Sequence, residues 1–136
     1  MIVVDTSALI AIVNNEAMAI ACQEVLAEDV NVLLNAATLT EALIVARRKK
    51  SLPGLTALID QLPITIIEVD EVRAERAVAA YAQWGKSFHK ASLNFGDCFS
   101  YATAREFDCP LLYVGNNFDE TDVVSAIPQA ADDKNP

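Results

Sequence analysis

The segment I-V-V-D-T-S-A-L-I, Ile2 to Ile10, decides the fold class. Its first three residues are apolar and β-branched, which is typical of a buried strand, and the hydroxyl residues after Asp5 can begin a helix. Similar apolar runs recur at Val30–Leu34, Ile64–Val69 and Leu111–Val114, and helical patterns lie between them. Strands that alternate with helices predict an α/β fold, a three-layer α/β/α sandwich around a short central parallel sheet.

The helical patterns and the turn residues complete the expected chain order. Thr38 is expected to cap a helix with Glu41 in capping-box register, and Val123–Ile127 is expected to form a last edge strand. One domain is predicted over residues 1–127, with a flexible tail at 128–136. The other helices are expected at Thr6 or Ser7 to Val13, Ala17–Ala27, Pro53–Gln61, Asp70–Trp84 and Gly96–Phe107.

Composition restricts the class of protein. Hydrophobic residues make up 53% of the 136 residues, which excludes a disordered or fibrous chain. No charge-free run approaches the ~18 residues that a membrane-spanning helix needs, so no membrane association is expected. Three cysteines without metal-type spacing fit the reducing cytoplasm. The mean hydropathy of +0.27 indicates that a partner covers some apolar surface.

The net charge of −9 argues against general nucleic-acid binding, which needs a basic surface. However, four of the ten basic residues are consecutive, at Arg47, Arg48, Lys49 and Lys50. This cluster either complements the dipole of a helix C-terminus or contacts RNA phosphates, and the sequence favours neither strongly. Lys86, with its neighbours His89 and Lys90, forms a second basic patch, which is either a solvated loop, slightly favoured, or a contact for RNA phosphates.

Motif content leaves carboxylates as the candidate catalytic groups. There is neither a G-x-G-x-x-G nor a Walker sequence, which disfavours dinucleotide and P-loop enzymes. A single histidine, His89, disfavours zinc sites and Ser-His-Asp chemistry. Three acids instead stand in apolar surroundings: Asp5 at a strand end, Glu41 one turn into a helix and Asp97 at the start of another helix.

Clustered carboxylates repel one another, and a divalent cation makes their charges favourable. Oxygen ligands select Mg²⁺ or Mn²⁺, which can orient a water molecule and neutralise charge on a phosphodiester. Each acid also has an ordinary structural interpretation. Asp5 can cap a helix, Glu41 can complete a capping box and Asp97 can complement a helix dipole.

Several segments, taken together and in order, resemble the PIN-domain family, and within it the VapC-type toxins of bacterial toxin–antitoxin pairs. Besides Ile2–Ile10, these are T-L-T-E-A at Thr38–Ala42, L-N-F-G-D-C-F-S-Y-A at Leu93–Ala102, P-L-L-Y-V-G-N-N-F at Pro110–Phe118, and Thr121-Asp122. The similarity spans about Ile2 to Ile127.

This resemblance implies an Mg²⁺- or Mn²⁺-dependent endoribonuclease that forms a homodimer and pairs with a cognate VapB-type antitoxin. Asp5, Glu41 and Asp97 would be the metal-binding acids, and Thr6 and Ser7 would orient Asp5 or a bound water. Three basic residues are predicted to position the RNA substrate: Arg47, Arg48 and Lys86.

One position departs from the family pattern. VapC-type toxins usually have aspartate where this chain has Asn117, and an amide keeps an oxygen acceptor but loses the charge. Asn117 and Asp122 are therefore secondary site residues. The alternative function is a catalytically weakened module that still binds RNA or its antitoxin. A phosphoacceptor that uses Asp5 is disfavoured, since no basic residue ends the Leu111–Val114 segment.

Overall fold

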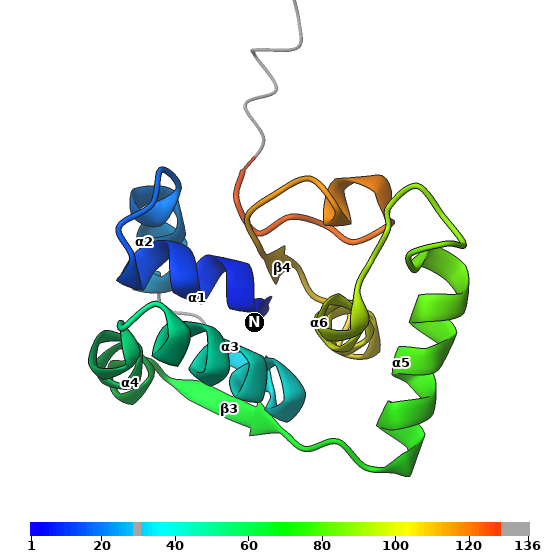
Figure 1. Cartoon of the computed structure of the whole chain (residues 1–136), viewed down its shortest axis with the longest axis horizontal. Coiled ribbons are helices and arrows are strands. Elements are labelled where there is room, and N and C mark those ends of the chain that lie inside the picture. The colour runs from blue at the N-terminus through cyan, green and yellow to red at the C-terminus, as the bar shows by residue number, and fades with distance from the viewer. Residues whose placement is uncertain (29–30, 129–136) are drawn as a thin grey trace, which may run out of the picture.

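The computed structural model describes residues 1–28 and 31–128. Its centre is a four-stranded sheet in the order β3-β2-β1-β4, in which every pairing is parallel. The strands are β1 (Ile2–Val4), β2 (Val32–Asn35), β3 (Ile64–Ile67) and β4 (Leu111–Leu112). The expected parallel sheet is confirmed (Figure 1).

The sheet is buried on both faces because apolar residues occupy successive positions along its strands. In β1, Ile2 and Val4 belong to one hydrophobic core and Val3 belongs to the other. This alternation follows from the two-residue period of a strand. β1 lies between β2 and β4, with Val3 opposite Leu33 and Leu111.

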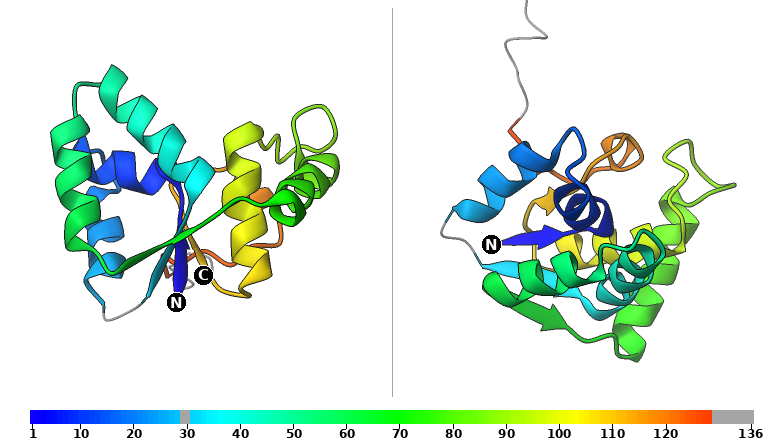
Figure 2. Two further views of the ribbon diagram at one scale, coloured as in Figure 1. Left: turned by 90° about the horizontal axis from the view of Figure 1, so that it is seen from below. Right: turned by 60° about the vertical axis from the view of Figure 1, so that its left-hand side comes forward.

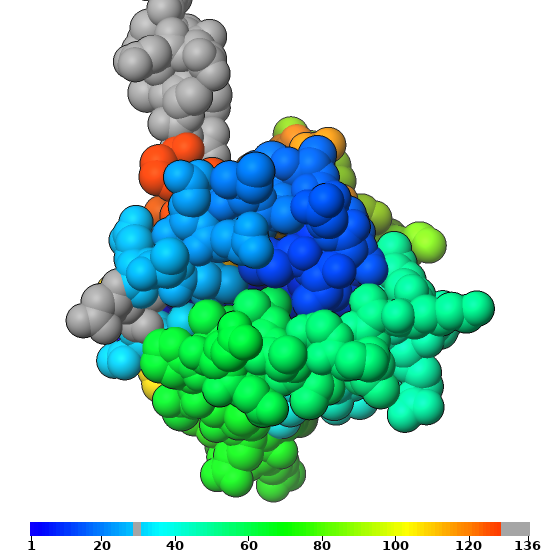
Figure 3. All heavy atoms as spheres, turned by 90° about the vertical axis from the view of Figure 1, so that its left-hand side faces the viewer, coloured from blue at the N-terminus to red at the C-terminus, as the bar shows by residue number. Residues whose placement is uncertain are grey.

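Helices cover the two faces of the sheet unequally. One core is shared with α1 (Thr6–Val13), α2 (Ala19–Ala27), α3 (Ala36–Arg48) and α4 (Leu52–Gln61), and the other with α5 (Glu71–Trp84) and α6 (Phe95–Glu106). Figure 2 shows these two groups on opposite sides of the strands, which confirms the three-layer arrangement. In Figure 3 the blue N-terminal helices lie directly on the green residues that follow α3.

Two local expectations are wrong. Thr38 is not a helix cap: α3 begins at Ala36, and Asn35 caps it by accepting a hydrogen bond from the Ala37 N–H at 2.8 Å. Since Asn35 directly ends β2, the chain turns into the helix three residues earlier than expected. Val123–Ile127 forms no strand, only an isolated bridge between Ser125 and Leu111.

The other predicted elements are present with bounds shifted by a few residues, except that Val30, the expected start of the second strand, lies outside the described residues. A short 3₁₀ helix (Phe118–Glu120) follows β4. The predicted tail at 128–136 lies outside the described residues, apart from Pro128. Within residues 1–28 and 31–128, no helix is both long and apolar enough to cross a membrane.

Candidate active site

Acids from three separate parts of the chain line one open cavity of about 340 Å³. Asp5 ends β1, Glu41 lies on α3 and Asp97 lies in the first turn of α6. The residues that contribute to this cavity are Asp5, Thr6, Ser7, Ile10, Glu16, Glu41, Val45, Lys49, Asn94, Asp97 and Val114. The parallel sheet therefore brings the three predicted acids to one site at the carboxyl end of β1, as is usual for such sheets.

Asp5 is buried and held by hydroxyl groups. It caps α1: its Oδ2 accepts hydrogen bonds from the Ser7 N–H at 3.1 Å and the Ser7 hydroxyl at 2.7 Å. Its Oδ1 accepts a hydrogen bond from the Ser100 hydroxyl at 2.5 Å. The Thr38 hydroxyl lies 3.2 Å from the Ser100 oxygen and donates to it, because the Ser100 hydroxyl hydrogen is already used in the hydrogen bond to Asp5. These hydrogen bonds fix both carboxylate oxygens.

Glu41 is half-buried and contacts α1 through a hydroxyl. The Thr6 hydroxyl donates a hydrogen bond to Glu41 Oε1 at 2.8 Å. Burial raises the pKa of Glu41, the hydrogen bond from Thr6 opposes that rise, and the charge of Asp5 adds to it. Thr6 and Ser7 therefore act on different acids, Thr6 on Glu41 and Ser7 on Asp5.

Asp97 completes a capping box at the start of α6. Its Oδ2 accepts a hydrogen bond from the Asn94 N–H at 3.0 Å, while its own N–H donates to Asn94 Oδ1 at 2.8 Å. Burial raises the pKa of Asp97 to about 6, the hydrogen bond from the Asn94 backbone opposes this, and the charges of Asp5 and Glu41 add to it. The Asn117 side chain lies close enough to lower the pKa slightly. The structural interpretation of Asp97 as a helix-capping residue is therefore confirmed, and its role as a metal ligand stays a prediction.

The three acids share the cavity but do not converge on one point. Within the described part of the chain, no three His, Cys, Asp or Glu side chains stand at the spacing of a metal cluster. Each carboxylate is instead hydrogen-bonded to a neighbouring hydroxyl or N–H group, while the charges of Asp5 and Glu41 raise the pKa of Asp97. Mutual repulsion in a partly buried site is the cost that a bound cation would relieve.

Two further charged residues line the cavity: Glu16, which the sequence does not indicate, and Lys49, from the basic cluster that has an RNA contact as one of its two interpretations. Lys49, at the end of α3, is the basic residue among those that line the cavity, and its Nζ lies 4.0 Å from Glu16 Oε2. Of the basic run, the sequence indicated Arg47 and Arg48, but neither lines the cavity. Neighbouring side chains around the end of α3 point in different directions, and the sequence alone does not show which direction faces the acids.

Other predicted site residues lie elsewhere. Asp122 Oδ1 accepts a hydrogen bond from the Tyr101 hydroxyl at 2.6 Å, and its Oδ2 lies 4.0 Å from Arg105 Nε. Asp119, a neighbouring acid in the same loop, likewise accepts a hydrogen bond from the Tyr113 hydroxyl. Neither acid lines the cavity, so the structure does not bring them to Asp97. Their tyrosine partners stabilise the loop after β4.

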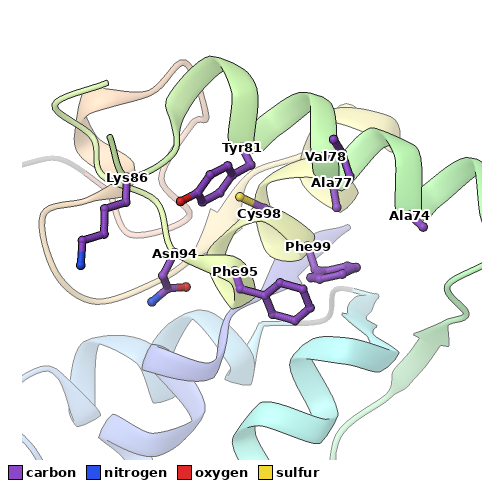
Figure 4. Close-up of a pocket in the computed structure, with 9 residues that line it drawn as sticks. All are labelled: Ala74, Ala77, Val78, Tyr81, Lys86, Asn94, Phe95, Cys98 and Phe99. Carbon is purple, nitrogen blue, oxygen red and sulfur yellow. The ribbon is translucent and has the colours of Figure 1, made fainter. Parts of the chain in front are cut away.

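An apolar groove borders the acidic cavity and is larger, at about 620 Å³. It lies between α5 and α6, and Figure 4 shows Val78 and Tyr81 on α5 above Phe95 and Phe99 on α6. Asn94 lines both the groove and the acidic cavity. Lys86, a predicted substrate-positioning residue, lines the groove and not the acidic cavity.

Comparison with known proteins agrees with this architecture. The family model described as PIN domain matches residues 2–124. The chain is 37% identical to Ribonuclease VapC of Mycolicibacterium smegmatis, covering 90% of this chain and 98% of the relative. It is 41% identical to Ribonuclease VapC28 of Mycobacterium tuberculosis, over 92% of this chain and 97% of the relative.

Solved structures give the same fold. The crystal structure of Mycobacterium tuberculosis VapC20, described as a Sarcin-Ricin loop cleaving toxin, superposes with a TM-score of 0.78 at 19% identity, covering 94% of this chain and 100% of that chain. A toxin–antitoxin complex from Klebsiella pneumoniae gives a TM-score of 0.70 at 19% identity, covering 93% and 98%. The chain belongs to the PIN-domain family and, within it, to the VapC ribonucleases.

Proposed function

We propose that this protein is an endoribonuclease toxin that hydrolyses RNA phosphodiester bonds at the cavity lined by Asp5, Glu41 and Asp97. The observation that carries the proposal is the meeting of these acids from β1, α3 and α6 in one cavity. Membership of the VapC ribonucleases supports the reaction class.

The donor set of the cavity fits Mg²⁺ or Mn²⁺. Asp5, Glu41 and Asp97 are hard oxygen donors, and among the described residues lining the cavity only Lys49 has a positive side chain to offset them. These three acids would hold the ion once their side chains turn towards it, because in this structure they do not stand at the spacing of metal ligands. Such an ion supplies Lewis-acid activation of water and charge neutralisation at the phosphodiester.

The protein's own residues prepare the site. The hydroxyls of Ser7 and Ser100 fix the carboxylate of Asp5, while Thr6 turns Glu41 towards α1. The capping box fixes Asp97 at the start of α6. These hydrogen bonds restrict the freedom of each carboxylate before a ligand binds, as outer groups that support metal ligands usually do.

The direct test is cleavage of a mixed RNA pool by the purified protein with Mg²⁺ or Mn²⁺, and with chelator. Cleavage is expected only with the metal, and Asp5→Asn is expected to remove it. The proposal would be refuted if Asp5→Asn cleaved RNA as well as the parent does, or if the parent cleaved RNA equally well with chelator.

Lys49 is expected to bind the RNA backbone at the rim of the cavity. It is exposed and paired only loosely with Glu16, so its charge is available to a phosphate. We expect Lys49→Ala to raise KM for RNA by about 10-fold, as loss of one charge-assisted contact does, and to leave kcat nearly unchanged. Arg47→Ala, on the same helix but outside the cavity, is the matched control. Equal effects of the two variants would show that only overall charge matters.

The raised pKa of Asp97 predicts that metal binding weakens in acid. Its pKa is about 6, so Asp97 gains a proton as the pH falls through 6 and then no longer attracts a cation. We expect Mn²⁺ affinity to fall by about 10-fold between pH 7 and pH 5, and the raised pKa of Glu41 acts in the same direction. Calorimetry at constant ionic strength measures this. An affinity that is constant or that rises in acid would contradict it.

The acidic cavity and the apolar groove beside it also indicate how a protein partner would bind. We propose a cognate VapB-type antitoxin that inserts an Arg or Lys into the acidic cavity in place of the metal and lays an apolar helix in the groove between α5 and α6. The groove borders the cavity at Asn94, which makes one partner able to span both. A homodimer in the cytoplasm is proposed from the family resemblance. Coexpression with the neighbouring open reading frame tests the pairing.

A further inference from the structure

Gly96 lies unusually close to the carboxylate of Glu41. Gly96 is the second residue of α6, and a Cβ atom added to it would stand 2.5 Å from Glu41 Oε2, 2.6 Å from Oε1 and 2.7 Å from Cδ. Real Cβ atoms essentially never approach other heavy atoms so closely. The carboxylate of Glu41 therefore occupies the space that a side chain at position 96 would need.

The Glu41 carboxylate is in contact with two helices, α1 and α6. The Thr6 hydroxyl donates to Glu41 Oε1 at 2.8 Å. The first turn of α6 meets the carboxylate at Gly96, immediately before Asp97. The N-terminus of a helix carries partial positive charge, so an acidic group is favoured there. Glu41 is thus held between two helices and next to a second acid.

The backbone does not explain the glycine. Among the four glycines of the chain, Gly115 has a positive φ, of 110°, whereas Gly96 lies inside a regular helix. Glycine in a helix is less favourable than alanine, because it loses more conformational freedom on folding. The need for glycine at position 96 therefore comes from the space that Glu41 occupies.

We propose that Gly96 is a positioning residue, whose missing side chain allows the Glu41 carboxylate to lie against the first turn of α6 beside Asp97. That this pair of acids serves a bound metal rests on the proposed function, but the placement itself does not. A side chain at position 96 would displace the carboxylate from Thr6 and from Asp97. Because Glu41 is flexible and its carboxylate is its far end, the displacement disturbs the site and leaves the fold intact.

Gly54→Ala is a matched control for Gly96→Ala. Gly54 also lies near the start of a helix, α4, but a Cβ there would meet Val13 Cβ at 3.8 Å, an ordinary contact. Both substitutions place alanine in a helix, and only the substitution at Gly96 crowds a carboxylate. Any difference between the two variants therefore reports on Glu41.

Crystal structures of the metal-free parent and of Gly96→Ala test the placement independently of activity. The variant is expected to fold, with the Glu41 carboxylate moved away from α6 and its hydrogen bond with Thr6 lost. A carboxylate that stays in place while the start of α6 shifts, or a variant that fails to fold, would overturn the inference.

Titration with Mn²⁺ tests the consequence for the site. We expect Gly96→Ala to bind Mn²⁺ about 10- to 100-fold more weakly than the parent, the loss that follows when the support of a ligand is removed. Gly54→Ala should bind like the parent, and in a Glu41→Ala background Gly96→Ala should cause no further loss. Equal losses from both alanine variants, or a full loss in the Glu41→Ala background, would overturn the inference. A parent without Mn²⁺ affinity would refute the metal site instead, and the crystal structures would still decide the placement.

Discussion

Replacing Asp97 by asparagine is expected to lower RNA cleavage by at least about 100-fold while making the metal-free protein more stable. The loss of activity follows because Asp97 is a proposed metal ligand, and removal of groups that only support a ligand already costs 10- to 100-fold. Asparagine keeps an acceptor for the Asn94 N–H, so the capping box at the start of α6 is largely retained.

The gain in stability follows from the sign of the pKa shift. The folded-state pKa of Asp97 is about 6, against an ordinary value of 3.8. Between these values the native protein binds more protons than the unfolded chain, so its stability falls as the pH rises from about 4 to about 6. At pH 7 the charged carboxylate therefore costs on the order of 2–3 kcal/mol, and asparagine removes that cost.

Thermal unfolding without metal at pH 7 and at pH 4 measures this prediction. The melting temperature of Asp97→Asn should exceed that of the parent at pH 7, and the difference should shrink at pH 4, where Asp97 of the parent is largely protonated. Added Mn²⁺ should stabilise the parent alone. Asp60→Asn, an exposed acid on α4, is the control and should change neither activity nor stability. A variant that is both inactive and less stable at pH 7 would contradict the electrostatic argument.

The strands of the fold and the three acids of the candidate site could be predicted from the sequence. The β-branched runs placed the strands, because a buried parallel strand shows its character in a few consecutive residues. Asp5, Glu41 and Asp97 could be proposed as one site, because each stands in apolar surroundings at a strand end or near a helix start, and the family resemblance supported the three together. Their assignment as metal ligands stays a prediction.

The features that the sequence did not predict depend on contacts between distant segments. The cap of α3 is Asn35 and not Thr38, because β2 ends directly at the helix, and Thr38 instead contacts Ser100 across 62 residues. Nor does spacing along the chain indicate that Gly96 meets Glu41 or that Lys49 lines the cavity. The contact between Gly96 and Glu41 arises because α3 and α6, which are far apart in the sequence, pack against each other.

Asn117→Asp is expected to strengthen metal binding and activity. Asn117 is exposed and its side chain lies near Asp97, where it lowers the pKa of that acid. Aspartate at this position would restore the acid that VapC-type toxins usually have there. Two unit charges 4 Å apart in water interact by about 1 kcal/mol, so a dication would gain about 2 kcal/mol, or roughly 30-fold in affinity. Without metal, the added charge should instead raise the pKa of Asp97 further and lower stability.

Asn116→Asp is the matched control, since it adds the same charge to the neighbouring exposed residue. Mn²⁺ titration and RNA cleavage at limiting Mn²⁺ should separate the two variants, and only Asn117→Asp should gain. If the parent is inactive and Asn117→Asp is active, the protein is the catalytically weakened module that still binds RNA or its antitoxin. Equal gains from both variants would mean that position 117 is not part of the site. If both proteins cleave RNA and Asn117→Asp needs less Mn²⁺, Asp5, Glu41 and Asp97 suffice for catalysis. An aspartate at position 117 would then only lower the metal concentration that catalysis requires.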